Sequence, residues 1–141
     1  MFKLKGRIIA FIILLGYVAL VCYMCLANFN DTDMASWMPE KLLGIDIDKC
    51  IHFCLFFPVP VLFFITFHGK RVLHSALFSM ICCIAAGTAI EFSQKLTAYR
   101  TFDVYDLYAN YLAIFCGTVI ISVVFAIRNL YLHIHDKKIK H

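Results

Sequence analysis

Ionisable and amide side chains recur at the ends of apolar segments in separate parts of this chain. The set consists of Asp48, Lys49, His52, Glu91, Gln94, Arg100, Asp103, Asp106 and Asn110. A charged group at the centre of a membrane costs roughly 2.5 to 3.5 kcal/mol on insertion scales, so such groups are seldom retained without a role. We therefore predict that these nine residues form a ligand-binding site.

The residue types in this set allow acid–base, cation-binding and ion-pair chemistry. Its four carboxylates outnumber its two basic groups, Lys49 and Arg100. A carboxylate left unpaired in a partly buried site binds a cation or donates a proton. His52, Glu91 and Asp106 are the candidate catalytic acid, base or metal ligands.

Two observations limit this chemistry. The spacing of the residues matches no zinc or calcium signature, and no Ser or Cys stands in an evident nucleophile arrangement with His52. No metal or other cofactor is therefore predicted. The structural alternative is a network of ion pairs that only holds the helices together.

The elements that must position these groups are membrane helices. Hydrophobic residues make up 62% of the chain and charged residues 16%, against about 45–50% and about 25% in soluble proteins. Four apolar segments reach the length of about 20 residues that spans a bilayer. We predict an all-α, four-transmembrane-helix bundle in one domain over 1–141, with helices at about 8–28, 49–68, 72–94 and 105–128. The first is predicted to be retained, not cleaved as a signal peptide.

Helical spacing assigns the polar residues to three helix faces, because positions three, four or seven apart share a face. The faces hold Asp48 and His52 on the second helix, Glu91, Gln94 and Gly87 on the third, and Asp103, Asp106, Asn110, Ala113 and Gly117 on the fourth. The small residues let a neighbouring helix approach closely. Exposure to lipid is costly, so the three faces are expected to meet, with Lys49 or Arg100 paired to Asp103, Asp106 or Glu91.

The distribution of basic residues predicts the orientation in the membrane. They gather in the N-terminal tail, the turn after the second helix and the C-terminal tail, as Lys3, Lys5, Arg7, Lys70, Arg71, Arg128, Lys137, Lys138 and Lys140. By the positive-inside rule, both termini face the cytoplasm and the chain is a multi-pass protein of the cytoplasmic membrane. The net charge of +4 then reflects topology and anionic lipid, and no nucleic-acid partner is predicted.

Several other features are interpreted as structural. The seven cysteines lie within or at the ends of apolar segments, which favours packing over disulfides or redox chemistry. Pro58 and Pro60 lack backbone donors and should bend or open the second helix near mid-membrane. Trp37, in the loop after the first helix, is typical of an interfacial anchor.

The remaining histidines are expected to be solvated. His68 and His74 flank the turn between the second and third helices. His133, His135 and His141 lie in a basic tail that is expected to have no defined fold and to hold no metal.

The ordered polar set resembles the pattern of a known family. Asp48-Lys49-x-x-His52-Phe53, Glu91-x-x-Gln94 and Arg100-x-x-Asp103-x-x-Asp106-x-x-x-Asn110 are similar to the VanZ-like family of small multi-pass bacterial membrane proteins. The similarity spans 48–117, about half of the chain. Ala113 stands where that family commonly has glycine, although Gly117 is present.

The resemblance implies a role at the cell envelope. The member that gave the family its name is associated with reduced susceptibility to teicoplanin, a lipid-bearing glycopeptide antibiotic that acts on a lipid-linked cell-wall precursor at the outer membrane face. A polar site at the outer helix ends would lie at that depth. The family carries no settled reaction to transfer.

Three hypotheses follow. In the first, the polar site engages a lipid headgroup, a cell-wall precursor or a lipoglycopeptide, with Arg100 and Lys49 contacting phosphate or carboxylate and Glu91, Asp103 and Asp106 positioning them. In the second, the chain is a membrane-embedded acid–base or metal-dependent enzyme acting on a lipid-linked substrate. In the third, it is an oligomeric carrier or scaffold, because four helices are few for a solute path.

Overall fold

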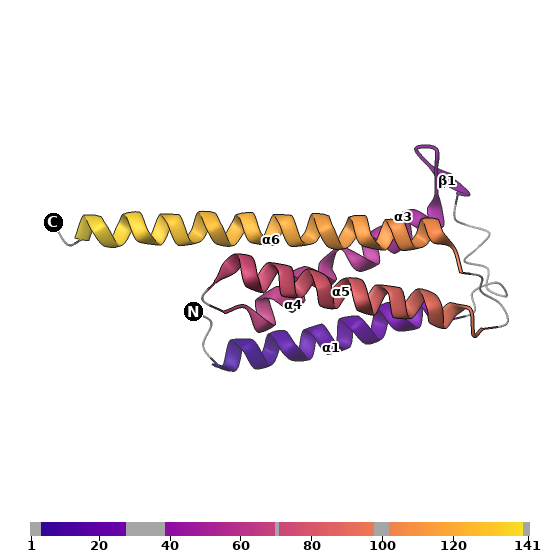
Figure 1. Cartoon of the computed structure of the whole chain (residues 1–141), viewed down its shortest axis with the longest axis horizontal. Helices are drawn as coiled ribbons and strands as arrows, with labels where there is room; N and C mark the ends of the chain where they lie inside the picture. The colour runs from indigo at the N-terminus through magenta and orange to yellow at the C-terminus, as the bar shows by residue number, and fades with distance from the viewer. Residues whose placement is uncertain (1–3, 28–38, 70, 98–101, 140–141) are drawn as a thin grey trace.

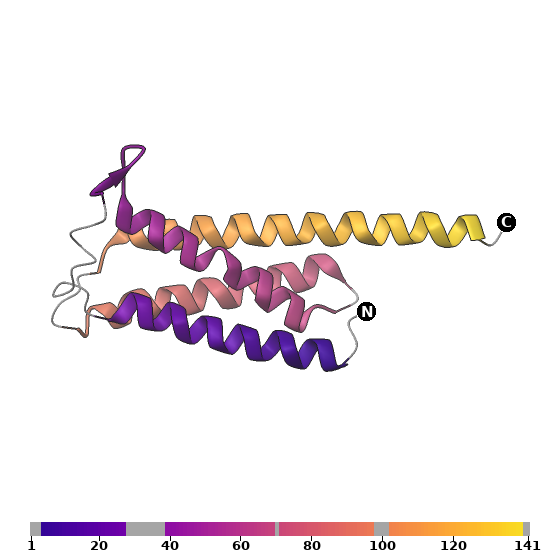
Figure 2. The ribbon, with the colours of Figure 1, turned by 180° about the vertical axis from the view of Figure 1, so that it is seen from behind.

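The computed structural model describes residues 4–27, 39–69, 71–97 and 102–139, with side chains described as far as residue 135. Four helices in these ranges are long and apolar enough to cross a membrane: Leu4–Leu26, Ile47–Phe67, Val72–Gln94 and Val104–His135. Figures 1 and 2 show them running lengthwise beside one another. The predicted all-α bundle of four membrane helices is confirmed. Trp37, Lys70 and Arg100 lie outside the described residues.

Helices α1 (Leu4–Leu26), α5 (Val72–Gln94) and α6 (Val104–Ile139) are uninterrupted. Their apolar sequences suit a hydrocarbon environment, where a helix satisfies every backbone donor and acceptor within its own segment. The second membrane segment is instead divided into α3 (Ile47–Phe56) and α4 (Pro58–Phe67). Pro58 and Pro60 supply no backbone N–H to the preceding turn, which explains the break at Phe57 and confirms the predicted bend.

The break is packed tightly against α6 at Gly117. A β-carbon added at Gly117 would collide with the carbonyl oxygen of Phe57 and lie 2.9 Å from Cγ of Pro60. On the side of α5, the hydroxyl of Ser79 donates to the carbonyl oxygen of Pro60 over 3.0 Å. The predicted close helix approach at Gly117 is therefore made to the bent second segment.

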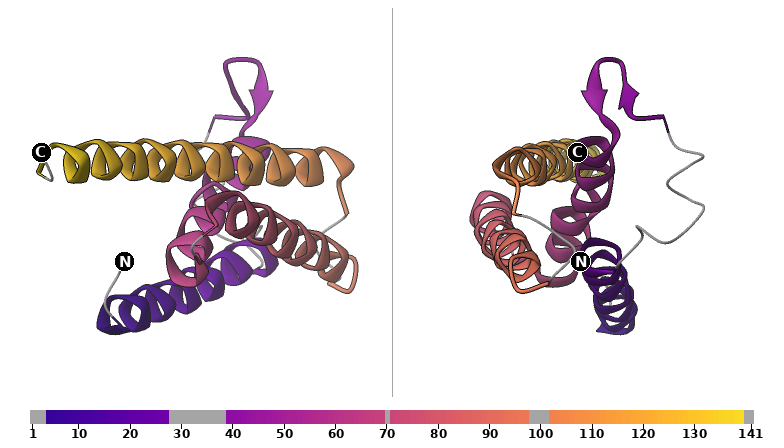
Figure 3. Two further views of the ribbon diagram at one scale, coloured as in Figure 1. Left: turned by 60° about the vertical axis from the view of Figure 1, so that its left-hand side comes forward. Right: turned by 90° about the vertical axis from the view of Figure 1, so that its right-hand side faces the viewer.

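The segment formed by α3 and α4 is the centre of the bundle. It contacts α1, α5 and α6, while α5 also packs against α1 and α6. Viewed along the bundle in the right panel of Figure 3, α1 and α6 lie on different sides of this central segment. One core cluster includes Val21, Phe56 and Ile114, and a second includes Phe64 and Phe125.

A small hairpin precedes α3. Strands β1 (Lys41–Leu42) and β2 (Ile45–Asp46) pair antiparallel. The turn residues Leu43 and Gly44 both have positive φ, 52° and 85°, as a two-residue hairpin turn of the primed type requires. Figure 1 places the hairpin at the end of the bundle where α6 begins. We call this the hairpin end.

Helix α6 is longer than predicted. It continues to Ile139 instead of ending near residue 128, and its 36 residues span about 54 Å at 1.5 Å per residue, against a hydrocarbon core of about 30 Å. Figures 1 and 2 show its last turns projecting beyond the bundle. The prediction of a tail without a defined fold is therefore wrong up to residue 139. His133 and His135 are exposed on this helix, as expected.

The opposite end of the bundle, which we call the basic end, holds the start of α1 and the turn between α4 and α5 (Figure 1). His74 is exposed there, as predicted. His68 is only 8% exposed, so the prediction of a solvated side chain is wrong. Its ring stacks on Phe64 and meets Phe125 of α6 edge-on, and its Nδ1 lies 3.1 Å from the carbonyl oxygen of Ile65. The aromatic contacts from two helices account for its burial.

Candidate functional site

Three helices bring most of the predicted site residues together at the hairpin end. We call the resulting cluster the polar network; it comprises Lys49 and His52 of α3, Glu91 of α5, Asp106 and Asn110 of α6, and Asp103 just before α6. It has a partly exposed layer formed by Lys49 and Asp103, and a buried layer formed by the other four residues. The expectation that the three polar helix faces meet is confirmed for these residues.

The exposed layer is centred on the Lys49 ammonium. Its Nζ lies 3.0 Å from Oδ2 of Asp103 and 3.3 Å from Oδ1 of Asp106. Asp46 of the hairpin adds a third carboxylate at 3.7 Å. The expected pairing of Lys49 with Asp103 and Asp106 is therefore present, and the ammonium is already surrounded by protein carboxylates. Sequence reasoning missed Asp46, although its position three residues before Lys49 was a usable signal.

Asp103 is the N-cap of α6. Its Oδ1 accepts a 2.8 Å hydrogen bond from the backbone N–H of Tyr105, which satisfies one of the unpaired donors at the helix start. This bond, together with the hydrogen bond from the Lys49 ammonium, holds the pKa of Asp103 below its ordinary value. The Asp103 carboxylate is thereby kept ionised in the partly exposed layer of the network.

In the buried layer, one imidazole joins α5 and α6. Nδ1 of His52 lies 3.1 Å from Oδ1 of Asn110 and 3.2 Å from Oε1 of Glu91. The Asn110 amide donates to the same Oε1 over 3.0 Å. Nδ1 faces two acceptors, so the proton of a neutral imidazole belongs on Nδ1. All three side chains are at most 2% exposed, which fixes the ring in one orientation.

The other imidazole nitrogen lies near a carboxylate of α6. Nε2 of His52 is 3.9 Å from Oδ2 of Asp106. One potential ligand atom from each of Asp48, His52 and Asp106 lies within 4.8 Å of the other two. With the proton on Nδ1, Nε2 carries the lone pair that can bind a cation or accept a proton. Asp48, His52 and Asp106 are thus the described residues best placed to hold a cation or to exchange a proton.

Two buried carboxylate oxygens in the network are not fully satisfied by the protein. Among the described residues, Oε2 of Glu91 has no hydrogen-bond partner. Oδ1 of Asp106 makes the ion pair with Lys49 but no hydrogen bond. A buried polar atom without a partner costs about 1–3 kcal/mol, more when charged, and such atoms are rare unless they serve a function.

Not every predicted residue joins the network. The amide of Gln94 donates to the carbonyl oxygen of Cys25 over 3.1 Å, which ties α5 to the end of α1. Gln94 therefore fastens two helices instead of facing the ion pairs. Arg100 lies outside the described residues.

The fold and this network define a small multi-pass membrane protein with a partly buried charged site at one end of a helix bundle. The family model VanZ/LLP1 matches residues 11–126, which is most of the chain. The protein therefore belongs to the VanZ/LLP1 family, and the family predicted from the polar motifs is confirmed.

One curated relative and one negative result complete the comparisons. The chain is similar to "Uncharacterized protein C11E3.10" of Schizosaccharomyces pombe (strain 972), with 37% identity over 65 residues. The aligned part covers 46% of this chain and 40% of that relative, so the chain spans less than half the length of the relative it matches. No solved structure matches the chain.

Proposed function

We propose that this VanZ/LLP1 protein engages the polar head of a membrane-anchored amphiphile at the polar network. The ligand classes are a lipid headgroup, a lipid-linked cell-wall precursor and a lipoglycopeptide. The observation that carries the proposal is Oε2 of Glu91, a buried carboxylate oxygen without a hydrogen-bond partner among the described residues. A ligand that donates a hydrogen bond would satisfy it.

The charge balance favours a ligand rich in N–H or O–H groups. Five carboxylates, those of Asp46, Asp48, Glu91, Asp103 and Asp106, are gathered around the Lys49 ammonium and the His52 ring. The contacts of Lys49 are already taken by carboxylates of Asp46, Asp103 and Asp106. We therefore assign the recognition of the ligand to the carboxylates, which suit an ammonium, amide or hydroxyl group better than a phosphate.

The graded exposure of the network supports a ligand that enters from the membrane surface. The side chains of Asp103, Lys49 and Asp106 are 35%, 21% and 6% exposed, while that of Glu91 is fully buried. An amphiphile whose tail stays in the bilayer would present its head at this depth. The positive-inside rule, applied to Arg7, Arg71 and Arg128 at the basic end, supports an extracytoplasmic position for the network end.

The relative from fission yeast bears on the choice among the three ligand classes. Its similarity to this chain favours a ligand that is not confined to bacterial cell walls, and a phospholipid headgroup with an ammonium or hydroxyl group meets that condition. A role in glycopeptide resistance at the cell envelope is the narrower form of the same proposal.

A growth assay tests the narrower form. Wild type, Glu91→Gln and Ser93→Ala are expressed at matched membrane levels in a susceptible bacterium and challenged with teicoplanin or with vancomycin, which lacks the acyl chain. Ser93 is the control because it lies near Glu91 on α5 and its hydroxyl, among the described residues, bonds to Ala89 of its own helix. Protection against teicoplanin by wild type and Ser93→Ala, lost in Glu91→Gln, is the expected result. Equal protection by all three would reduce the network to a structural role.

The second candidate function is a membrane-embedded acid–base or metal-dependent enzyme. It is favoured by His52, whose Nδ1 is fixed by Glu91 and Asn110 while Nε2 lies 3.9 Å from Asp106 and the ring forms a possible ligand group with Asp48 and Asp106. This arrangement resembles the way second-shell groups orient a catalytic or metal-binding histidine. Elemental analysis of the purified protein should then show bound metal that Asp48→Asn loses, or product analysis should show a lipid-linked substrate altered by wild type and not by His52→Gln. Wild type with neither property would refute this function.

A further inference from the structure

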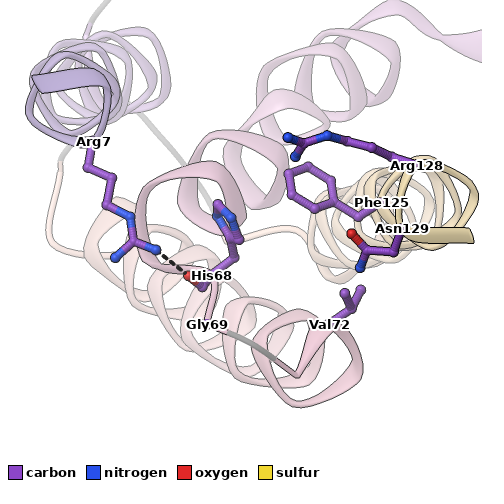
Figure 4. Close-up of a pocket in the computed structure, with 7 residues that line it drawn as sticks. All are labelled: Arg7, His68, Gly69, Val72, Phe125, Arg128 and Asn129. Atoms are coloured by element: carbon purple, nitrogen blue, oxygen red, sulfur yellow. Dashed lines mark hydrogen bonds between the residues drawn. The ribbon is translucent and has the colours of Figure 1, made fainter. Parts of the chain in front are cut away.

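A pocket lies at the basic end, away from the polar network. It has a volume of about 280 Å³ and is bounded by α1, the residues that follow α4, the start of α5 and α6. This size is close to the lower limit of small-molecule pockets, roughly 300–1,000 Å³, and suits a single polar headgroup. Figure 4 shows its side chains converging from helices that are far apart in the sequence.

Two arginines supply the charge of this pocket. In Figure 4, Arg7 of α1 and Arg128 of α6 lie on either side of His68. Nη2 of Arg7 donates to the carbonyl oxygen of His68 over 2.8 Å, while its buried Nε has no hydrogen-bond partner among the described residues. Arg128 is placed over the ring of Phe125, with its Cζ 5.6 Å from the ring centroid. The protein thus uses only part of the hydrogen-bonding capacity of Arg7.

No carboxylate neutralises these cations in the described part of the chain. Neither Arg7 nor Arg128 makes an ion pair with a described side chain, and none of the residues that bound the pocket is acidic. The remaining polar side chain, the Asn129 amide, is a further N–H donor. The pocket therefore presents positive charge and donors, the reverse of the polar network.

We propose that this basic pocket binds a phosphate group, carried by the headgroup of an anionic membrane lipid or by a soluble phosphate compound. A guanidinium presents planar, paired N–H donors that match phosphate oxygens, and two of them on different helices can approach one phosphate from both sides. The ring of Phe125, which His68 contacts edge-on, lies under the Arg128 guanidinium and stabilises its position. This proposal is independent of the function assigned to the polar network.

The position of the pocket favours the lipid as the source. Arg7 is near the start of a membrane helix, and Arg128 is where the apolar part of α6 gives way to its basic continuation. Basic pockets between helices at this level are typical sites for anionic lipid headgroups. Bound lipid would also bridge α1 and α6, which pack on different sides of the central segment (Figure 3).

The test is lipid titration of the full-length, detergent-purified protein, followed by native mass spectrometry. Phosphatidylglycerol is titrated into wild type, Arg7→Gln, Arg128→Gln and Arg71→Gln, with phosphatidylcholine as the lipid control. Arg71 is the matched variant because it is an exposed arginine at the same end that does not line the pocket. Arg7→Gln also removes the bond to His68, whereas Arg128→Gln leaves it intact, so the latter decides the result if the former fails to fold. In a parallel competition titration, inorganic phosphate is added to the lipid-bound proteins.

We expect phosphatidylglycerol to bind wild type and Arg71→Gln equally, and at least tenfold more weakly to Arg128→Gln and Arg7→Gln. Failure of inorganic phosphate to displace the lipid at millimolar concentration would identify the lipid headgroup as the source. Displacement by phosphate, again sensitive to Arg128→Gln, would identify a soluble phosphate compound. Equal affinity of Arg128→Gln and Arg71→Gln for both probes would overturn the proposal.

Discussion

The two ends of the bundle treat charge in opposite ways. At the hairpin end, Lys49 lies within 3.7 Å of three carboxylates, and His52 is held between Glu91 and Asn110. At the basic end, Arg7 and Arg128 have no carboxylate partner among the described side chains. The hairpin end pairs its charges internally and has more acceptors than donors. The basic end has cations that are available to groups outside the protein. Charged side chains are therefore tolerated at the ends of these membrane helices in two ways: they pair with opposite charges inside the bundle, or they lie where lipid headgroups can reach them.

The largest expected effect follows from breaking the buried layer at the hairpin end. Glu91→Ala removes the acceptor that serves both His52 and Asn110, which leaves the buried Asn110 N–H without this partner and His52 with Asn110 as its remaining contact at Nδ1. Loss of one member of a buried charged pair costs about 3–5 kcal/mol. Unfolding free energies in detergent should therefore fall by that amount for Glu91→Ala.

The same measurement on Glu91→Gln should give a much smaller loss, because the amide oxygen still accepts from Asn110. Ser93→Ala on the same helix should be nearly neutral, since its hydroxyl, among the described residues, bonds within α5. A Glu91→Ala protein as stable as Ser93→Ala would contradict the assignment of His52 and Asn110 as groups that depend on this carboxylate.

The next largest effect on stability is expected at the bend between α3 and α4, which lies between the two ends of the bundle. Gly117→Ala would place a methyl group against the Phe57 carbonyl and Pro60. Overpacking of this kind costs about 1–3 kcal/mol. Thermal unfolding should show the loss, while Gly16→Ala is the control because a β-carbon at Gly16 meets nothing within 4 Å. Equal melting temperatures for the two variants would disprove the tight contact between α6 and the bent segment.

A smaller, pH-dependent effect is expected at the exposed layer. The folded-state pKa of Asp103 is lowered from 3.8, so its contribution to stability is present above about 3.8 and is lost as pH falls through the lower, folded value. Asp103→Asn keeps a good N-cap residue but removes the charge that pairs with Lys49. Its destabilisation should be under about 1 kcal/mol at pH 7, as for other partly exposed ion pairs.

The difference between wild type and Asp103→Asn should shrink as the pH is lowered below 3.8, and thermal melts between pH 7 and pH 3 measure it. A difference that stays constant over this range would show that the carboxylate charge is not what Asp103 contributes.

The smallest effect on stability is expected at the basic end. Arg128→Gln removes a cation that rests on Phe125 and has no carboxylate partner among the described side chains. The unfolding free energy should change by no more than about 0.5 kcal/mol, as for most surface substitutions. A loss of stability as large as that of Glu91→Ala would contradict the claim that charge is paired internally at the hairpin end and not at the basic end.

The sequence was sufficient to predict the membrane helices and much of the polar network. A period of 3.6 residues places Asp106 and Asn110 on one face of α6, with Asp103 at the N-cap before them, and burying that face against the other polar faces follows from the cost of exposing it to lipid. The pairing of Lys49 with Asp103 and Asp106 could be predicted for the same reason.

What the sequence could not predict depends on contacts between distant segments. Gln94 shares a face with Glu91, yet it bonds to Cys25 because α1 ends beside it, and the apolar sequence of α1 gives no signal of that position. His68 is buried by contacts with Phe64 and with Phe125 of α6. The predicted end of α6 near Arg128 is too early, because a single charge does not end a helix and the helix continues through Leu130, Leu132 and Ile134.

The proposed engagement of an amphiphile at the polar network is tested most directly by lipid retention. The full chain is purified as wild type, Asp106→Asn and Glu40→Gln, and co-purifying lipids are quantified by native mass spectrometry; Glu40 is an exposed carboxylate next to the hairpin and outside the network. We predict that wild type and Glu40→Gln retain the same amphiphile and that Asp106→Asn loses it while remaining folded. Identical lipid profiles for all three proteins would contradict the claim that the network binds a ligand.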